Sequence, residues 1–343
     1  MYRFTNDYSE GCHPLMLEAI SKANLEGNFG YSTDPHCAHA ADLIRKAANA
    51  PAAHVHFVCS GTQVNLIAIC SALRPHQAVI ATKLAHPCLH EAGAFEATGH
   101  KVIAVDCDYD SKLTPEAILN CPDLNNNEHG VQPKLVYISN TTEMGAVYTG
   151  AELAAISKVC KDKGLYLFLD GARLGSAFVS GGANLEETAK YCDFFTIGGT
   201  KNGALFGEAL VICNPALMED FRYILKQRGG LMAKGYLMGV QFETFFQDGL
   251  YEKLALHAAE LARQLRDGME KLGVSFLCHS PSNQQFPILP NNVLKILSAD
   301  FHWETIEKIS EDMTAIRLVT SFATKPEAVT AWLTALEKAL INQ

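Results

Sequence analysis

The sequence lacks the features that would make a membrane or a nucleic acid its partner. It contains no apolar run approaching the roughly 20 residues that a membrane-spanning helix requires. It also has no block of Lys and Arg, and 28 basic against 37 acidic residues give a net charge of −9. Affinity for DNA or RNA depends on neutralising phosphates, so an acidic chain is a poor nucleic-acid binder. We therefore expect no membrane and no nucleic acid among its partners.

Cysteines at the spacing of a metal or redox site are also missing. The 11 cysteines are an odd number, and no Cys-x-x-Cys pair occurs. The first seven residues hold no apolar stretch of signal-peptide length, so we expect reduced thiols in a cytoplasmic protein. His36 with His39, and His54 with His56, each have the spacing of half a metal site. Ordinary surface or core histidines are the preferred interpretation, and we predict no metal.

What the sequence does have is the composition and pattern of an α/β protein. Its 343 residues are 48% hydrophobic and 19% charged, which is typical of a globular chain of about two domains. Helix-like segments, among them 62–73 and 150–163, alternate with apolar runs. This alternation predicts a mostly parallel central sheet with helices on both faces. The runs expected to be strands are 54–59, 78–82, 101–106, 135–139, 165–169, 194–197 and 209–213.

The two ends of the chain have a different pattern. Residues 14–26 are expected to form a helix, with Pro14 at its start and Gly27 just after its end. After about residue 250, a long helical stretch (251–272) precedes strand candidates at 274–277 and 315–320 and a final helix at 326–341. We therefore divide the chain into an N-terminal segment with a large domain, 1–250, and a smaller α/β C-terminal domain, 251–343.

Three polar features follow predicted strands, where open α/β sheets bind their ligands. Ser60-Gly61-Thr62 follows a strand and opens a helix, so its N–H groups form either a phosphate cradle or a plain turn. Asp170 ends an apolar strand and either needs a cationic partner or caps the next helix. Lys201 has glycines nearby that leave room for a ligand. It is either a solvated loop lysine or the amine that forms a Schiff base with a carbonyl cofactor.

In combination the three features are more specific than any one of them. A phosphate cradle, a strand-end Asp and a Lys 31 residues after that Asp occur in this order in fold-type I enzymes that use pyridoxal 5'-phosphate (PLP). The chemistry accounts for each part. The cofactor's phosphate needs the cradle, its aldehyde needs a lysine amine, and a carboxylate keeps its ring nitrogen protonated, so that the ring can accept electrons.

Further motifs carry a resemblance to one family of these enzymes. Asp170-Gly171-Ala172-Arg173-Leu174 is the most diagnostic, because other PLP families usually have different residues after this Asp. With it, the chain resembles the threonine aldolase family, within the wider β-eliminating-lyase group, over essentially its full length. The other matching stretches are 6–11, 30–35, 60–65, His86 with Glu91, 139–142, 200–201 and 317–320.

The resemblance implies a role for each matched residue. Lys201 is the Schiff-base lysine, Asp170 pairs with the pyridine nitrogen, and His86 stacks on the cofactor ring and is a candidate catalytic base. Another histidine or an ordered water is the alternative base. The remaining assigned residues are Ser60, Gly61 and Thr62 at the cofactor phosphate, Arg173 and Arg317 at the substrate carboxylate, with Arg173 also beside the cofactor, and Asn6 and Tyr31 at the substrate pocket.

The sequence departs from the family pattern at three positions. Asn6 stands where the family often has a serine. Ala233 occupies a position where an arginine is common, and Ser321 replaces a histidine. The departure at Asn6 concerns the substrate carboxylate, and the one at Ala233 concerns the contacts of the cofactor phosphate.

The resemblance implies PLP-dependent cleavage of β-hydroxy-α-amino acids, L-threonine and L-allo-threonine, to glycine and an aldehyde by a homotetramer that is a dimer of dimers. One alternative is a PLP-dependent β-eliminating lyase or another fold-type I amino-acid enzyme. The other is a non-catalytic ligand- or nucleotide-binding α/β protein. No Gly-x-Gly-x-x-Gly follows the early strands, which argues against dinucleotide binding.

Overall fold

The computed structural model describes residues 1–341 and is built around a seven-stranded sheet. Strand β8 is antiparallel to both of its neighbours, and all other adjacent strands are parallel. The seven predicted strands are all present, and the prediction of a mostly parallel sheet is confirmed. From edge to edge the order is β2 (His54–Val58), β8 (Glu208–Ile212), β7 (Phe194–Gly198), β6 (Tyr166–Asp170), β5 (Gln132–Ser139), β3 (Gln77–Thr82) and β4 (Val102–Val105).

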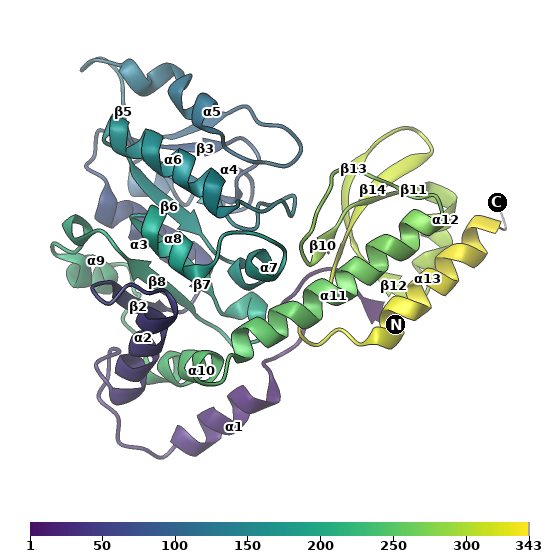
Figure 1. Cartoon of the computed structure of the whole chain (residues 1–343), viewed down its shortest axis with the longest axis horizontal. Coiled ribbons are helices and arrows are strands. Elements are labelled where there is room, and N and C mark those ends of the chain that lie inside the picture. Colours follow the sequence, from purple (N-terminus) through teal and green to yellow (C-terminus); the bar gives the residue numbers. More distant parts are fainter. Residues whose placement is uncertain (342–343) are drawn as a thin grey trace.

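Helices cover both faces of this sheet (Figure 1), as predicted. Successive residues of a strand point to opposite faces, so Tyr137 and Ile138 of β5 belong to different hydrophobic clusters. One face packs against α2 (Pro35–Ala47), α6 (Gly150–Lys163), α8 (Leu185–Tyr191) and α10 (Tyr236–Gln247), and the other against α3 (Gly61–Ala72) and α9 (Phe221–Gln227).

Shorter elements complete the large body. Helix α1 ends three residues before the predicted residue 26, because Asn24 closes its last turn with a main-chain bond to Ser21. The short helices are α1 (Pro14–Ala23), α4 (His86–Leu89), α5 (Pro115–Leu119) and α7 (Leu174–Val179), with 3-10 turns η1 (Glu96–Thr98), η2 (Pro122–Asn125), η3 (Thr200–Asn202) and η4 (Pro215–Leu217).

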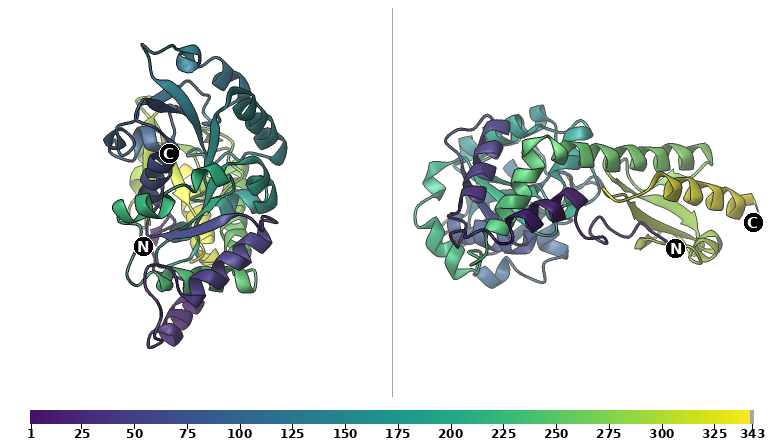
Figure 2. Two further views of the ribbon diagram at one scale, coloured as in Figure 1. Left: turned by 90° about the vertical axis from the view of Figure 1, so that its left-hand side faces the viewer. Right: turned by 90° about the horizontal axis from the view of Figure 1, so that it is seen from below.

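A smaller body lies beyond the long helix α11 (Leu250–Lys271), which packs against α7 at one end and lies beside α13 (Pro326–Ile341) at the other (Figure 2). A third hydrophobic cluster, with Trp332 fully buried, fills it. The strand β14 (Met313–Val319) pairs with β10 (Gln284–Gln285), β11 (Pro287–Pro290) and β13 (Glu304–Lys308). Strand β9 (Ser275–Phe276) lies on the other side of β11, and helix α12 (Asn291–Leu297) follows β11 in the chain.

The N-terminus is attached to this smaller body. Strand β1 (Tyr2–Arg3) pairs in parallel with β12 (Phe301–His302), and the ring of Phe4 packs edge-on against Trp332. The chain then returns to the large body through residues 5–13, so residues near the start of the sequence run along the junction of the two bodies.

Two further observations concern the surroundings of the protein. Among residues 1–341, no helix combines the length and apolar character that crossing a bilayer would require. All eleven cysteines are free thiols.

Candidate active site

The predicted site residues gather at one edge of the large sheet. Asp170 ends β6 and is paired with Ser139 at the end of β5, while Gly198 at the end of β7 is paired with Glu208 at the start of β8. Because β2 and β7 are both antiparallel to β8, they run in the same direction, and Ser60 follows β2 at this same edge. This is where an open α/β sheet binds ligands.

Asp170 is a buried acid whose hydrogen-bond donors are all neutral. Its Oδ2 accepts from the Tyr137 hydroxyl at 2.7 Å and from Asn65 Nδ2 at 3.2 Å, and its Oδ1 accepts from the Ala172 N–H at 2.9 Å. Within residues 1–341, no Lys, Arg or His forms an ion pair with it. A buried carboxylate in this situation calls for a cation from outside the chain, and a protonated ring nitrogen supplies one.

The alternative role of Asp170 as a helix cap is wrong. Helix α7 begins at Leu174, and its N-cap residue is Arg173, which makes no side-chain capping bond. The bond from the Ala172 N–H to Asp170 therefore belongs to the turn that precedes the helix.

His86 is linked to Asp170 through two polar side chains. Its Nδ1 lies 2.7 Å from Oε1 of Glu91, and the same oxygen accepts from Asn65 Nδ2 at 2.6 Å. Asn65 in turn donates to Asp170, so four of the matched residues form one connected network. Glu91 is only 5% exposed and holds the imidazole through Nδ1, which leaves Nε2 available to a ligand.

The first turn of α3 is open to an anion. Its N-cap residue, Ser60, makes no side-chain capping bond, and the N–H groups of Gly61 and Thr62 have no acceptor among residues 1–341. A Cβ built on Gly61 would meet no protein atom within 4 Å. Free N–H groups at the start of a 12-residue helix, facing open space, fit a phosphate group.

Lys201 lies in the turn after β7, and the packing of that turn explains the small residues around it. A Cβ on Gly198 would collide with the carbonyl oxygen of Ala172, and one on Gly199 with that of Gly207. Burial lowers the pKa of Lys201, and the positive charge of Arg173 lowers it further. An amine with a lowered pKa is more often in the nucleophilic, neutral form.

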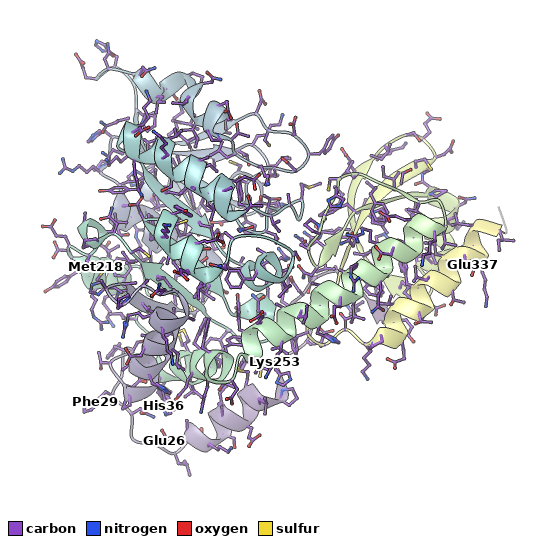
Figure 3. All side chains as sticks on the ribbon, in the orientation of Figure 1. Glu26, Phe29, His36, Met218, Lys253 and Glu337 are labelled. Atoms are coloured by element: carbon purple, nitrogen blue, oxygen red, sulfur yellow. The ribbon has the colours of Figure 1, made fainter. Side chains whose placement is uncertain are left out.

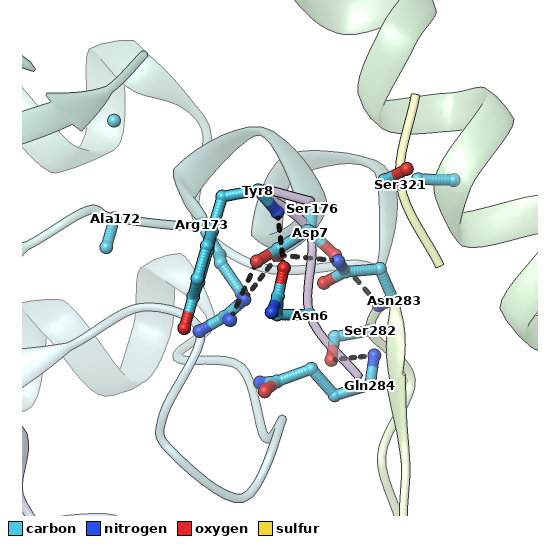
Figure 4. Close-up of polar contacts among 12 residues, drawn as sticks. Asn6, Asp7, Tyr8, Ala172, Arg173, Ser176, Ser282, Asn283, Gln284 and Ser321 are labelled. Carbon is cyan, nitrogen blue, oxygen red and sulfur yellow. Dashed lines mark hydrogen bonds and ion pairs between the residues drawn. The ribbon is translucent and has the colours of Figure 1, made fainter. Parts of the chain in front are cut away.

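Arg173 is fixed by an acid from the N-terminal segment (Figure 4). Its Nε and Nη2 donate to the two oxygens of Asp7, at 2.7 and 3.0 Å, and Asn283 Nδ2 donates to Asp7 Oδ2 at 3.0 Å. Asn6 lies next to this pair, and its Oδ1 accepts from Tyr8 N and Ser9 Oγ. The side chain of Asn6 is therefore engaged in a local turn at the edge of the site.

Arg317 on β14 faces the same region from the smaller body. Its Nη2 forms an ion pair with Glu304 and its Nη1 lies 3.4 Å from Gln284 Oε1, while its buried Nε has no partner. Burial lowers the pKa of Arg317, and the nearby charge of Arg173 lowers it further. Two arginines that repel each other, one with an unused buried donor, fit an anionic group such as a carboxylate.

Tyr31 is not brought to Lys201 within one chain. Its ring lies 4.3 Å from Lys226 Nζ, and its carbonyl oxygen accepts from Arg222. Tyr31 and Ser32 both have left-handed backbone angles, φ +61° and +57°, which are strained for non-glycine residues. The loop also presents Phe29 to solvent, at the periphery of the large body (Figure 3).

The histidines of the first predicted pair are engaged by glutamates. His36 is held between Glu26 and Glu243, and His39 contacts the same Glu243 (Figure 3 labels Glu26 and His36). In the part of the chain that the structure describes, no group of three or more His, Cys, Asp or Glu side chains is placed to hold a metal ion.

The structure adds four residues that sequence reasoning did not assign to the site. Asp7 and Asn65 lie inside the matched motifs, so their position was the available signal. Tyr137 and Glu208 had none: Tyr137 lies at an interior position of β5, and Glu208 opens an otherwise apolar strand.

Comparison with known proteins agrees with this geometry. The family model described as beta-eliminating lyase matches residues 5–292. The low specificity L-threonine aldolase of Pseudomonas aeruginosa is 32% identical over 301 residues, covering 86% of this chain and 84% of that protein. The enzyme of the same name from a Pseudomonas species is 34% identical, covering 77% of each.

Solved structures give the same result. The threonine aldolase of Leishmania major is 47% identical, with a TM-score of 0.96 over 98% of this chain and 99% of that one. The aspartate aminotransferase of Thermus thermophilus, at 15% identity and a TM-score of 0.74, shares the fold alone. The fold is thus that of the fold-type I enzymes, as predicted.

Proposed function

This chain belongs to the β-eliminating lyase family, and from that premise we propose that it is a PLP-dependent aldolase. It cleaves β-hydroxy-α-amino acids, with L-threonine and L-allo-threonine as the expected substrates, to glycine and an aldehyde. One observation carries the proposal: Asp170, the open first turn of α3 and Lys201 meet at one edge of the sheet. The names of the similar proteins favour the aldolase among the reactions of this family.

The residues present fit PLP. The N–H groups of Gly61 and Thr62, with Ser60, would hold the phosphate, Asp170 would pair with the ring nitrogen, and Lys201 would bind the aldehyde carbon. When bound, the cofactor supplies an electron sink for the bond that breaks at the substrate's Cα.

The substrate carboxylate is assigned to two arginines. Arg317 offers its unused Nε, and Arg173 offers the part of its guanidinium that Asp7 does not occupy. Asp7 keeps Arg173 in one orientation, so the carboxylate is held at a fixed position. Fixing the carboxylate determines which bond at Cα is broken, since that choice depends on the orientation of the substrate.

A proton must leave the β-hydroxyl as the carbon–carbon bond breaks. His86 is our candidate for the base, because Glu91 holds its Nδ1 and leaves Nε2 free. Another histidine or an ordered water is the alternative. Burial and the charge of Arg173 lower the pKa of Lys201, so its amine gives up a proton more readily than an exposed lysine.

We further propose that two copies complete each site and that the protein is a homotetramer, a dimer of dimers. The exposed loop with Phe29 and Tyr31 supports this, because strain and exposed aromatic rings are characteristic of functional contact surfaces. The boundary near residue 250, at the start of α11, is the proposed division between the large and small domains. Eleven free thiols favour a reducing compartment, the cytoplasm.

Product analysis of the purified, PLP-loaded protein tests the proposal. We expect glycine and acetaldehyde from L-threonine and L-allo-threonine, glycine and benzaldehyde from phenylserine, and neither activity nor a visible absorption band in Lys201→Ala. Ammonia and 2-oxobutanoate from threonine would instead identify an eliminating lyase. A borohydride-reduced pyridoxyl group on another lysine would overturn the assignment of Lys201.

A further inference from the structure

Glu208 is a buried carboxylate that contacts the turn carrying Lys201, and the proposed reaction provides no role for it. It is 7% exposed at the start of β8, opposite Gly198 in the sheet register. Its Oε2 accepts from the N–H of Gly199 at 2.9 Å, and the adjacent Gly207 N–H donates to Thr200 Oγ1 at 3.2 Å. Both contacts fix the short turn between the end of β7 and Lys201.

The same loop shows that a charge is not needed to hold such a turn. The N–H of Leu205 donates to Oε1 of Gln241 at 2.7 Å, and Gln241 is fully buried. Here a neutral amide holds a main-chain N–H group of the loop. A carboxylate at the same kind of position carries a desolvation cost that an amide avoids. The negative charge of Glu208 therefore calls for a reason beyond the hydrogen bond to Gly199.

Lys201 supplies that reason. We propose that Glu208 is a positioning residue whose carboxylate both orients the turn that carries Lys201 and compensates the charge of the buried amine. This inference rests on the proposed function, because it takes Lys201 as the lysine that binds PLP. The inference adds a protein side chain, distinct from the cofactor and the substrate, that influences the protonation of Lys201.

The electrostatics of the two groups agree with this arrangement. Burial raises the pKa of Glu208 to about 7, against the opposing effects of its bonds to Thr200 and Gly199 and of the charge on Lys201. Burial and Arg173 lower the pKa of Lys201, while Asp7, Asp170 and Glu208 raise it. The charge on each group affects the other, so we expect their titrations to be coupled.

Competitive acetylation of the cofactor-free protein measures this coupling without any turnover. The extent of Lys201 labelling, quantified by mass spectrometry across pH, gives the titration midpoint of its amine. Removing the negative charge in Glu208→Gln should lower that midpoint by roughly one pH unit or more, while keeping an oxygen for the Gly199 N–H. After PLP is added, the pH midpoint of the visible band should move in the same direction.

Gln241→Ala is the matched control, because it removes a buried side-chain bond to the same loop and leaves every charge in place. It should leave the Lys201 midpoint unchanged, and Glu208→Asp should restore most of the shift. An unchanged midpoint in Glu208→Gln would reduce Glu208 to a turn-forming residue. If this variant does not fold, the curve of Lys201 labelling against pH in the wild-type protein provides the test. Coupling predicts a broader transition than that of one independent site. A curve that fits one independent site overturns the proposal.

Failure of this inference and failure of the proposed function give different results. If Lys201 is not the cofactor lysine, Lys201→Ala keeps a visible band whatever Glu208 does. If only the coupling is absent, Lys201→Ala loses the band while the Lys201 midpoint is the same in wild type and Glu208→Gln.

Discussion

Asp7 holds the guanidinium of Arg173 through two hydrogen bonds, although the two residues are 166 positions apart in the sequence. Asn283 of the smaller body donates to the same carboxylate. The N-terminal segment, the end of the central sheet and the smaller body therefore meet at one buried ion pair. Arg173 is already oriented before any substrate arrives, which reduces the entropy lost on binding.

Asp7→Asn should weaken substrate binding and lower stability at neutral pH. Burial raises the pKa of Asp7, but Arg173 and Lys201 outweigh it and the net pKa is lowered. A lowered carboxylate pKa contributes stability above its unfolded value near 4 that is lost as pH falls through the folded value. We expect KM to rise, the free energy of unfolding at pH 7 to fall by about 3–5 kcal/mol, and the dependence of stability on pH below 5 to flatten. Denaturant titrations from pH 3 to 7 measure this, and parallel curves for variant and wild type would contradict it.

Asp170→Asn should leave a folded protein that still binds PLP but turns over slowly. Asn can keep the oxygen that accepts from Tyr137 and Asn65, while its NH2 group replaces the oxygen that accepts from the Ala172 N–H, and the charge is removed. Without that charge the ring nitrogen is less protonated, so kcat should fall by orders of magnitude. Steady-state kinetics at saturating PLP provide the measurement. A kcat close to that of wild type would assign Asp170 a structural role only.

His36→Gln should destabilise the contact between α2, α10 and the segment after α1 in a pH-dependent way. Burial lowers the pKa of His36, but its bonds to Glu243 and Glu26 outweigh burial and raise the net pKa. Its contribution is therefore complete below the unfolded value near 6.5 and disappears as pH rises through the folded value. We expect a larger loss of Tm at pH 6 than at pH 9. His39→Gln, which removes only one exposed contact to Glu243, is the control.

Much of the fold followed from local pattern. The strands of the large sheet are short, mainly apolar runs between turn residues. Composition and periodicity were therefore enough to locate them in the sequence. Most strands of the smaller body are too short for that: β10 and β12 have two residues each, and no period can be read from two positions. They form because β14 and β1 offer them partners from distant parts of the chain.

The residues of the candidate site also fall into those that the sequence located and those that it did not. Lys201, Asp170 and Ser60 follow strands, and the parallel direction of those strands brings them together, so the sequence was sufficient. Asp7 lies in a matched motif, but its pairing with Arg173, like the contact of Glu208 with Gly199, depends on how distant parts of the chain pack, which the sequence alone does not show. Burial of a lone carboxylate in an apolar strand becomes informative only when the lysine beside it is known.

Mixing two inactive variants should recover activity if the sites are shared between copies. In Tyr31→Ala the lysine is intact, and in Lys201→Ala the tyrosine is intact. A mixed dimer therefore contains one site with both residues, provided that Tyr31 reaches the site of the other copy. Partial unfolding and refolding of the mixture, followed by an activity assay and light scattering for mass, tests this. A tetramer without recovered activity would place Tyr31 outside the site, and an active monomer would contradict the assembly.

Arg317→Ala should reduce kcat/KM by at least about tenfold. The lost contact to the substrate carboxylate is a charge-assisted hydrogen bond of about 1.5–3 kcal/mol, and about 1.4 kcal/mol corresponds to a factor of ten. Loss of alignment should also lower kcat, so the effect extends beyond KM. Glu304→Gln separates this role from the ion pair that Arg317 makes within the smaller body, because it removes the pair and keeps the guanidinium. We expect Glu304→Gln to retain most of the activity, and an equal loss in the two variants would show that Arg317 acts through that ion pair.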